Sequence, residues 1–164
     1  MVRDRELQCY RGRLREALDH GTRPPRTLVW IEADGVKVRL NGTFGQLLRV
    51  GPKPELAPET VAEYAWLVSR YAGDGLGPYR VTEEIDEALF RATPENAARE
   101  RVAELLHPAE VSLTEGGFRV RVAATRAGGL SQIEIDIDPQ GRVGLHRVSP
   151  LLEESSVCAA RVLR

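Results

Sequence analysis

The chain has 164 residues, of which 42% are hydrophobic and 29% are charged, and its formal net charge is −1. This size and composition are typical of a soluble globular protein, and the near-neutral charge argues against bulk electrostatic binding to nucleic acid or a membrane. The sequence has no run of about 20 apolar residues that could cross a membrane, and its charged N-terminus does not resemble a signal peptide. Cys9 and Cys158 lack the spacing of a metal or redox motif, so we expect free, buried thiols and a cytoplasmic location.

The first predicted element is an amphipathic helix over residues 3–20. Leu7 and Leu14 lie seven residues apart, which places them on one face of a helix. The opposite face mixes five arginines, among them Arg11 and Arg15, with four acidic residues. This balance of charge favours a solvated helix face over a phosphate-binding one.

A β-hairpin is predicted next, over residues 27–40. Asp34 and Gly35 form a dipeptide that is among the strongest signals for a two-residue turn. That turn places Trp30 opposite Arg39, where the guanidinium can stack on the indole ring.

Beyond the hairpin, an Asn-Gly turn leads into a third strand, predicted over residues 43–50 and carrying Phe44. The glycine-rich residues 73–78 indicate a linker. Helices are predicted on both sides of this linker and at the C-terminus, from three- and four-residue apolar spacing and from capping residues followed by proline. They cover residues 59–72, 83–91, 94–106 and 151–163.

Strict alternation of apolar and polar residues predicts a second antiparallel meander in the last third of the chain. One register places the aliphatic side chains on one face and pairs Arg121 with Glu134 and Arg119 with Asp136 on the other. The same register, continued through the next turn, places His146 opposite Glu134. The predicted strands are residues 111–113, 118–125, 131–138 and 142–148.

These elements predict an α+β fold with two antiparallel β-meanders of three to four strands, packed by flanking helices. A helix, three strands and a helix occur in residues 1–73 and again in residues 94–164, joined by residues 74–93. This order raises the hypothesis of a duplicated α-βββ-α unit within one compact domain. The order is similar to that of small secretion-chaperone-like bacterial domains, a resemblance of topology that carries no sequence motif and implies dimerisation through helix and sheet edges.

Three carboxylates, Glu134, Asp136 and Asp138, are predicted to lie on one strand face about 7 Å apart. Such a row could collect Mg²⁺ or Ca²⁺, which prefer several oxygen ligands. Arg119 and Arg121 lie across the strands where they neutralise it, so we favour a salt-bridged, solvated face. We expect no metal and no other cofactor.

The leading functional hypothesis is a non-catalytic cytoplasmic protein that binds another protein as an adaptor or chaperone and forms a homodimer. The sequence contains none of the short motifs of nucleotide-binding, zinc-peptidase or serine-hydrolase sites. Each predicted sheet also has edge strands that must be covered, paired or protected. Protein binding therefore explains more of the pattern than catalysis does.

Two alternatives stay open. A small enzyme could use the acidic strand face, with Glu134, Asp136 and His146 as its reactive groups. A nucleic-acid-binding protein could use the N-terminal arginines together with an aromatic and arginine sheet face, because such side chains contact phosphates and stack on bases. Its candidate binding residues are Arg11, Arg15, Trp30, Arg39 and Phe44.

Overall fold

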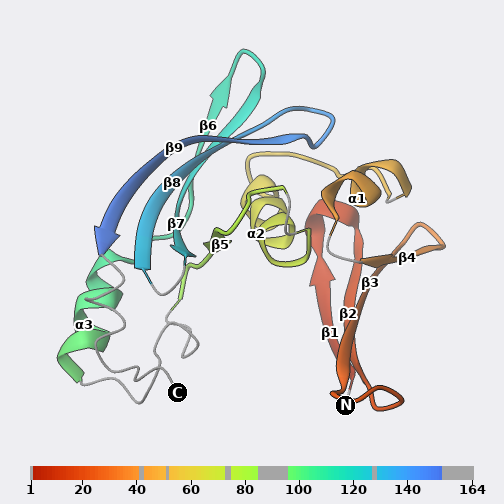
Figure 1. Ribbon diagram of the computed structural model, residues 1–164. Coiled ribbons are helices and arrows are strands. Elements are labelled where there is room, and N and C mark those ends of the chain that lie inside the picture. The colour runs from red at the N-terminus through yellow and green to blue at the C-terminus, as the bar shows by residue number, and fades with distance from the viewer. Residues whose placement is uncertain are drawn as a thin grey trace.

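The computed structural model describes residues 2–40, 43–50, 52–72, 75–84, 96–126 and 129–152. They form two antiparallel sheets, A and B, with one helix, α2, between them (Figure 1). The predicted α+β fold class is therefore confirmed. No helix among these residues is long and apolar enough to span a membrane.

Sheet A is a four-stranded meander in which a hairpin replaces the helix predicted over residues 3–20. A 3-10 turn and Arg11, whose φ is 44°, reverse the chain in the middle of that range. Leu7 and Leu14 then reach the same buried face from adjacent strands, a placement that their seven-residue spacing also gives on a helix. The helix predicted over residues 3–20 is therefore wrong, because this spacing fits a hairpin as well as a helix. The strands are β1 (Val2–Leu7), β2 (Gly12–Asp19), β3 (Arg26–Ala33) and β4 (Val36–Leu40), with the 3-10 turn η1 (Gln8–Tyr10) between the first two.

The predicted β3–β4 hairpin is confirmed residue by residue. Asp34 and Gly35 form its turn with φ values of 51° and 73°, the positive values that a type I′ turn requires. Trp30 faces Arg39 across the two strands, as predicted.

Residues 43–50 form a helix, α1 (Phe44–Val50), and the strand predicted there is wrong. Leu47 is buried, and Phe44 packs against the same core from one turn earlier. Their spacing of three residues places both side chains on one helical face.

The helix α2 (Val61–Tyr71) confirms the helix predicted over residues 59–72 and lies between the two sheets (Figure 1). Val61, Tyr64 and Val68 are fully buried and join side chains of both sheets in one hydrophobic core. We call the face of each sheet that packs toward this core its inner face, and the opposite face its outer face.

Sheet B contains the second predicted meander, and the register between its two central strands is confirmed. Arg121 faces Glu134 and Arg119 faces Asp136 on the outer face. The aliphatic residues of the inner face are buried, as predicted. The strands are β5 (Arg80–Val81), β6 (Glu110–Thr114), β7 (Gly117–Arg126), β8 (Gly129–Ile137) and β9 (Val143–Leu152); β5 and β6 both pair with β7.

The register between β8 and β9 agrees with the prediction only as far as Leu145, which pairs with Ile135. A β-bulge then shifts the pairing, so that Arg147 and not His146 lies opposite Glu134. The position predicted for His146 is wrong because a bulge adds one residue to one strand.

The helix α3 (Asn96–Leu105) lies within the helix predicted over residues 94–106. It packs on the outer face of sheet B, where Val102 meets Ala123, Leu130 and Leu152. Among the described helices, α3 alone lies on that outer face, at one end of it (Figure 1).

The helix predicted over residues 151–163 does not begin where expected, because Leu151 and Leu152 extend β9. The rest of that range, like most of the helix predicted over residues 83–91, lies outside the described residues. Residues 83–84, the part of the second range that is described, are not helical.

The duplicated α-βββ-α unit is not confirmed. Sheet A begins with strands, and sheet B takes β5 from before α3. The helix-first order behind the resemblance to secretion-chaperone-like domains is therefore not found in residues 2–40. The division of the chain at residues 74–93 stays a prediction.

Candidate functional site

The longest open backbone edge in the described part of the chain belongs to β9, a strand of ten residues. It pairs with β8 on one side, and no described strand pairs with its other side, which we call the β9 edge. The N–H of Asp138 donates to the C=O of Arg142 at 3.0 Å. The backbone groups of Arg142 therefore point toward β8, and this determines which residues of β9 point their backbone groups away from β8. The alternation of antiparallel pairing then turns the N–H and C=O groups of Val143, Leu145 and Val148 toward the β9 edge.

Pro150 supports this orientation of the strand. It lies opposite Ser131, a position whose backbone N points to the β9 edge by the same alternation. Proline lacks an N–H and is tolerated in a sheet only where no ladder bond is lost. The pattern of a capping residue followed by proline predicts a helix from residue 151, directly after Pro150, but Pro150 lies inside β9.

The side chains along the β9 edge differ between the two faces of sheet B. On the inner face Leu145 remains 41% exposed. On the outer face Arg142 and Arg147 are exposed, and neither guanidinium has an ion pair with another described residue. β9 itself carries no acidic residue.

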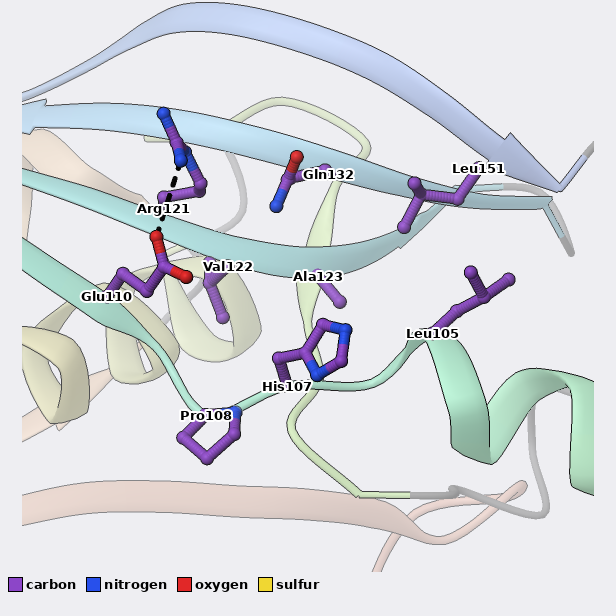
Figure 2. Close-up of a pocket in the computed structure, with 9 residues that line it drawn as sticks. All are labelled: Leu105, His107, Pro108, Glu110, Arg121, Val122, Ala123, Gln132 and Leu151. Carbon is purple, nitrogen blue, oxygen red and sulfur yellow. Dashed lines mark hydrogen bonds and ion pairs between the residues drawn. The ribbon is translucent and has the colours of Figure 1, made fainter.

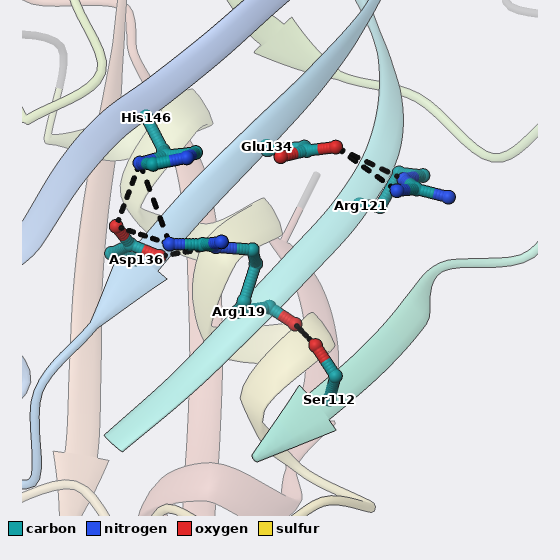
Figure 3. A network of polar contacts seen from close by, with 6 residues as sticks. All are labelled: Ser112, Arg119, Arg121, Glu134, Asp136 and His146. Carbon is teal, nitrogen blue, oxygen red and sulfur yellow. Dashed lines mark hydrogen bonds and ion pairs between the residues drawn. The ribbon is translucent and has the colours of Figure 1, made fainter. Parts of the chain in front are cut away.

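The acidic residues next to this edge are paired with arginines on the outer face of sheet B (Figure 3). Arg119 Nε lies 2.7 Å from Asp136 Oδ1, and its Nη2 lies 3.2 Å from Oδ2. Arg121 Nη2 lies 3.1 Å from Glu134 Oε1. The cross-strand pairing predicted from the sequence is confirmed, and we call these four residues the ion-pair face.

His146 lies at the margin of the ion-pair face. Its Nδ1 is 3.3 Å from Asp136 Oδ2 and 3.4 Å from Arg119 Nη2, which the bulge makes possible by turning the ring away from Glu134. The hydrogen bond from Arg119 holds the pKa of Asp136 below its usual range, and His146 lowers that pKa further when it is protonated.

The three carboxylates proposed as weak metal ligands do not converge on one point. Glu134 and Asp136 each bind an arginine. Asp138 Oδ1 accepts hydrogen bonds from the N–H groups of Gln140 and Arg142 in the β8–β9 turn. Among the described residues, no three potential metal ligands form a cluster.

The outer face of sheet A brings together several of the predicted nucleic-acid-binding residues. Arg15, Trp30 and Arg39 lie side by side on adjacent strands, and none of the described helices covers this face (Figure 1). The cation on the Trp30 ring is Lys37, with Nζ 4.4 Å from the centroid, so the stacking predicted for Arg39 is corrected. We call Arg13, Arg15, Trp30, Glu32, Lys37 and Arg39 the Trp30 face.

Glu32 neutralises the centre of the Trp30 face. It accepts a hydrogen bond from Trp30 Nε1 at 3.0 Å and lies 3.3 Å from Lys37 Nζ and 3.2 Å from Arg15 Nε. The indole hydrogen bond is the main cause that lowers the pKa of Glu32. Arg13 and Arg39 are exposed and keep their charge available to an anion.

The remaining predicted binding residues lie apart from the Trp30 face or at its end. Arg11 follows η1, and its Nε forms a 2.6 Å ion pair with Glu55. Phe44 is on α1 and packs against the core, because residues 43–50 are helical. Phe44 is therefore not part of the sheet surface on which it was predicted.

A small notch lies where α3 meets the outer face of sheet B (Figure 2). Its polar lining residues are His107, Glu110, Arg121 and Gln132, and Leu105 and Leu151 contribute apolar walls. Its volume is about 10 Å³, enough for one water but not for a substrate.

Cys9 is buried and free, as predicted, whereas Cys158 lies outside the described residues. Burial, reinforced by the neighbouring Glu63 carboxylate, raises the pKa of the Cys9 thiol. A raised thiol pKa removes the reactive thiolate, so Cys9 is a packing residue.

No protein-family model, curated protein or solved structure matches this chain.

Proposed function

We propose that this chain is a non-catalytic protein-binding domain that adds an extended segment of its partner to the β9 edge. The observation that supports this most directly is a ten-residue strand whose outward backbone groups meet no described segment. Partner strands add to such edges because the free N–H and C=O groups continue the sheet ladder.

The β9 edge is also partly protected against indiscriminate pairing. Natural edge strands avoid aggregation through bulges, prolines and charged side chains, and β9 has a bulge at His146, a proline at Pro150 and a charge at Arg147. These features leave the outward N–H and C=O groups of Val143, Leu145 and Val148 able to form hydrogen bonds with a partner strand. Such a pattern suits a strand that accepts one kind of segment.

The test uses a pair of variants at Leu145. Leu145→Pro removes an outward N–H without removing a bond to β8, while Leu145→Ala keeps the N–H and shortens the exposed side chain. The tagged variants and wild type are purified from the native host at low salt, and their companions are measured by native mass spectrometry. We expect a stoichiometric companion with the wild type and the alanine variant, and none with the proline variant. A companion that persists with Leu145→Pro would refute strand addition at this edge.

A second candidate function is single-stranded nucleic-acid binding through the Trp30 face. It is favoured by the exposed Arg13 and Arg39 beside Trp30 on an uncovered sheet surface. It requires Trp30 to exchange its contacts with Lys37 and Glu32 for a base. Salt-dependent binding of a labelled oligonucleotide that is lost in Arg39→Ala and Trp30→Ala supports it, and binding unaffected by both changes removes it.

We further propose a cytoplasmic location and an adaptor or chaperone role. The free, buried Cys9 suits a reducing compartment. The homodimer expected from the sequence is a separate proposal, and native mass spectrometry of the purified chain measures it directly.

A further inference from the structure

We infer that the strand accepted at the β9 edge alternates acidic and apolar residues, with its acids on the outer face of sheet B. This inference rests on the proposed strand addition and adds the chemistry of the partner. It follows from the different side chains that β9 presents on its two faces.

The outer face of the β9 edge carries positive charge that the chain itself does not neutralise. Arg142 and Arg147 are exposed, and their guanidinium groups have no ion pair among the described residues. The carboxylates of β8 that face these arginines form no ion pair with them. Glu134, opposite Arg147, binds Arg121. Asp138, opposite Arg142, accepts hydrogen bonds from two backbone N–H groups of the β8–β9 turn. An added strand would lie beside two unpaired cations, which favour carboxylates.

The spacing of these cations matches the repeat of a strand. Arg142 and Arg147 are five residues apart, but the bulge at His146 removes one residue from the count of strand positions. Four positions correspond to about 13 Å at roughly 3.3 Å per residue. Acidic residues at every second position of an added strand therefore meet both arginines on the same face.

The inner face of the same edge is apolar. Leu145 is 41% exposed there, and Val143 and Val148 on either side of it are half-buried against the core. An apolar side chain from the added strand would cover Leu145 and continue the aliphatic inner face of sheet B. The partner strand is thus acidic outside and apolar inside.

A second copy of β9 is a poorer occupant of this edge. Antiparallel pairing of two β9 strands would bring together two strands that each carry Arg147 and no acidic residue. Like charges on paired strands are destabilising. The charge pattern therefore favours a different, acidic segment over self-association at this edge.

The probe is a blocked, fluorescein-labelled peptide of alternating glutamate and valine, as long as β9, and binding is followed by fluorescence anisotropy. A peptide with lysine in place of glutamate is the matched probe. We expect the glutamate peptide to bind wild type more tightly, and Arg147→Glu to weaken it by about three- to tenfold. The same variant should strengthen binding of the lysine peptide. Arg26→Glu, at an exposed position of β3 in sheet A, is the control and should change neither.

The outcomes distinguish strand addition at the β9 edge from the preference for an acidic strand. Equal binding of both peptides, no binding of either, or an unchanged preference in Arg147→Glu overturns the acidic partner. If Leu145→Pro still abolishes the native companion, strand addition survives and only its charge preference is wrong. If Leu145→Pro leaves both the companion and the glutamate peptide bound, the proposed function fails as well.

Discussion

Replacing Tyr64 by phenylalanine tests how α2 holds the turn that begins β9. The Tyr64 hydroxyl donates a 2.7 Å hydrogen bond to the carbonyl of Gly141, and both residues are buried. Phenylalanine keeps the ring and its packing, and it removes this bond together with the hydroxyl contact to Tyr10. A buried carbonyl left without a partner costs about 1–3 kcal/mol. We expect Tyr64→Phe to lower the free energy of unfolding by that amount.

Urea unfolding followed by circular dichroism measures this loss, and Tyr79→Phe is the matched control. Tyr79 is itself buried, but its hydroxyl accepts only a 3.3 Å hydrogen bond from Nη1 of Arg126, an exposed side chain that can turn to water instead. The control should lose no more than about 0.5 kcal/mol. If Tyr64→Phe loses no more than Tyr79→Phe, Gly141 is solvated and α2 does not hold the β8–β9 turn.

Three further changes follow from burial and charge. Cys9 should resist alkylation in the folded protein and react once denaturant exposes it, because burial raises its pKa; peptide mass mapping reports this, and equal reaction in both states would contradict it. Burial and the Glu16 carboxylate raise the pKa of Tyr71 to about 12. The protonated Tyr71 hydroxyl therefore contributes its full stability below the ordinary phenol pKa of about 10, and this contribution is lost as the pH rises through the pKa of Tyr71 in the folded protein. The ultraviolet titration curves of wild type and Tyr71→Phe should differ near pH 12. A difference at pH 10 would refute the raised pKa. The pKa of Asp136 is lowered, so its pairing stabilises the fold above the ordinary carboxyl pKa of about 3.9 and this contribution is lost as the pH falls through the folded value. Arg119→Ala should lower stability only slightly at neutral pH, because the pair is half-exposed, and urea curves of variant and wild type should converge in acid.

Local patterns that admit one interpretation predicted the structure well. The Asp34-Gly35 turn allows only one register for the β3–β4 hairpin. In β7 and β8, a slip of one residue would break both the aliphatic face and the pairing of Arg119 with Asp136. These two signals are independent, which is why the register was confirmed.

Patterns that fit two structures misled the prediction. Leu7 and Leu14 share a face either on a helix or across a hairpin, and their spacing cannot distinguish the two. Phe44 and Leu47 carry a three-residue spacing that indicates a helix, but the preceding Asn-Gly turn suggested another strand.

The bulge and the candidate site in β9 had a signal in the sequence that was overlooked. The apolar alternation changes phase between Leu145 and Val148, which are three residues apart, as expected where a bulge inserts one residue. Pro150 then marks an edge strand. By contrast, which edge of sheet B stays open depends on contacts between distant segments, and no local pattern predicts it.

Amide hydrogen exchange, resolved by residue with NMR, tests strand addition at the β9 edge most directly. In the free protein the Leu145 and Val148 amides should exchange fast, and the Gly144 amide, which points to β8, should exchange slowly. Adding the glutamate and valine peptide should protect Leu145 and Val148 and leave Gly144 unchanged. A Leu145 amide that is already protected in the free chain, or that gains no protection when the peptide binds, would contradict strand addition at this edge.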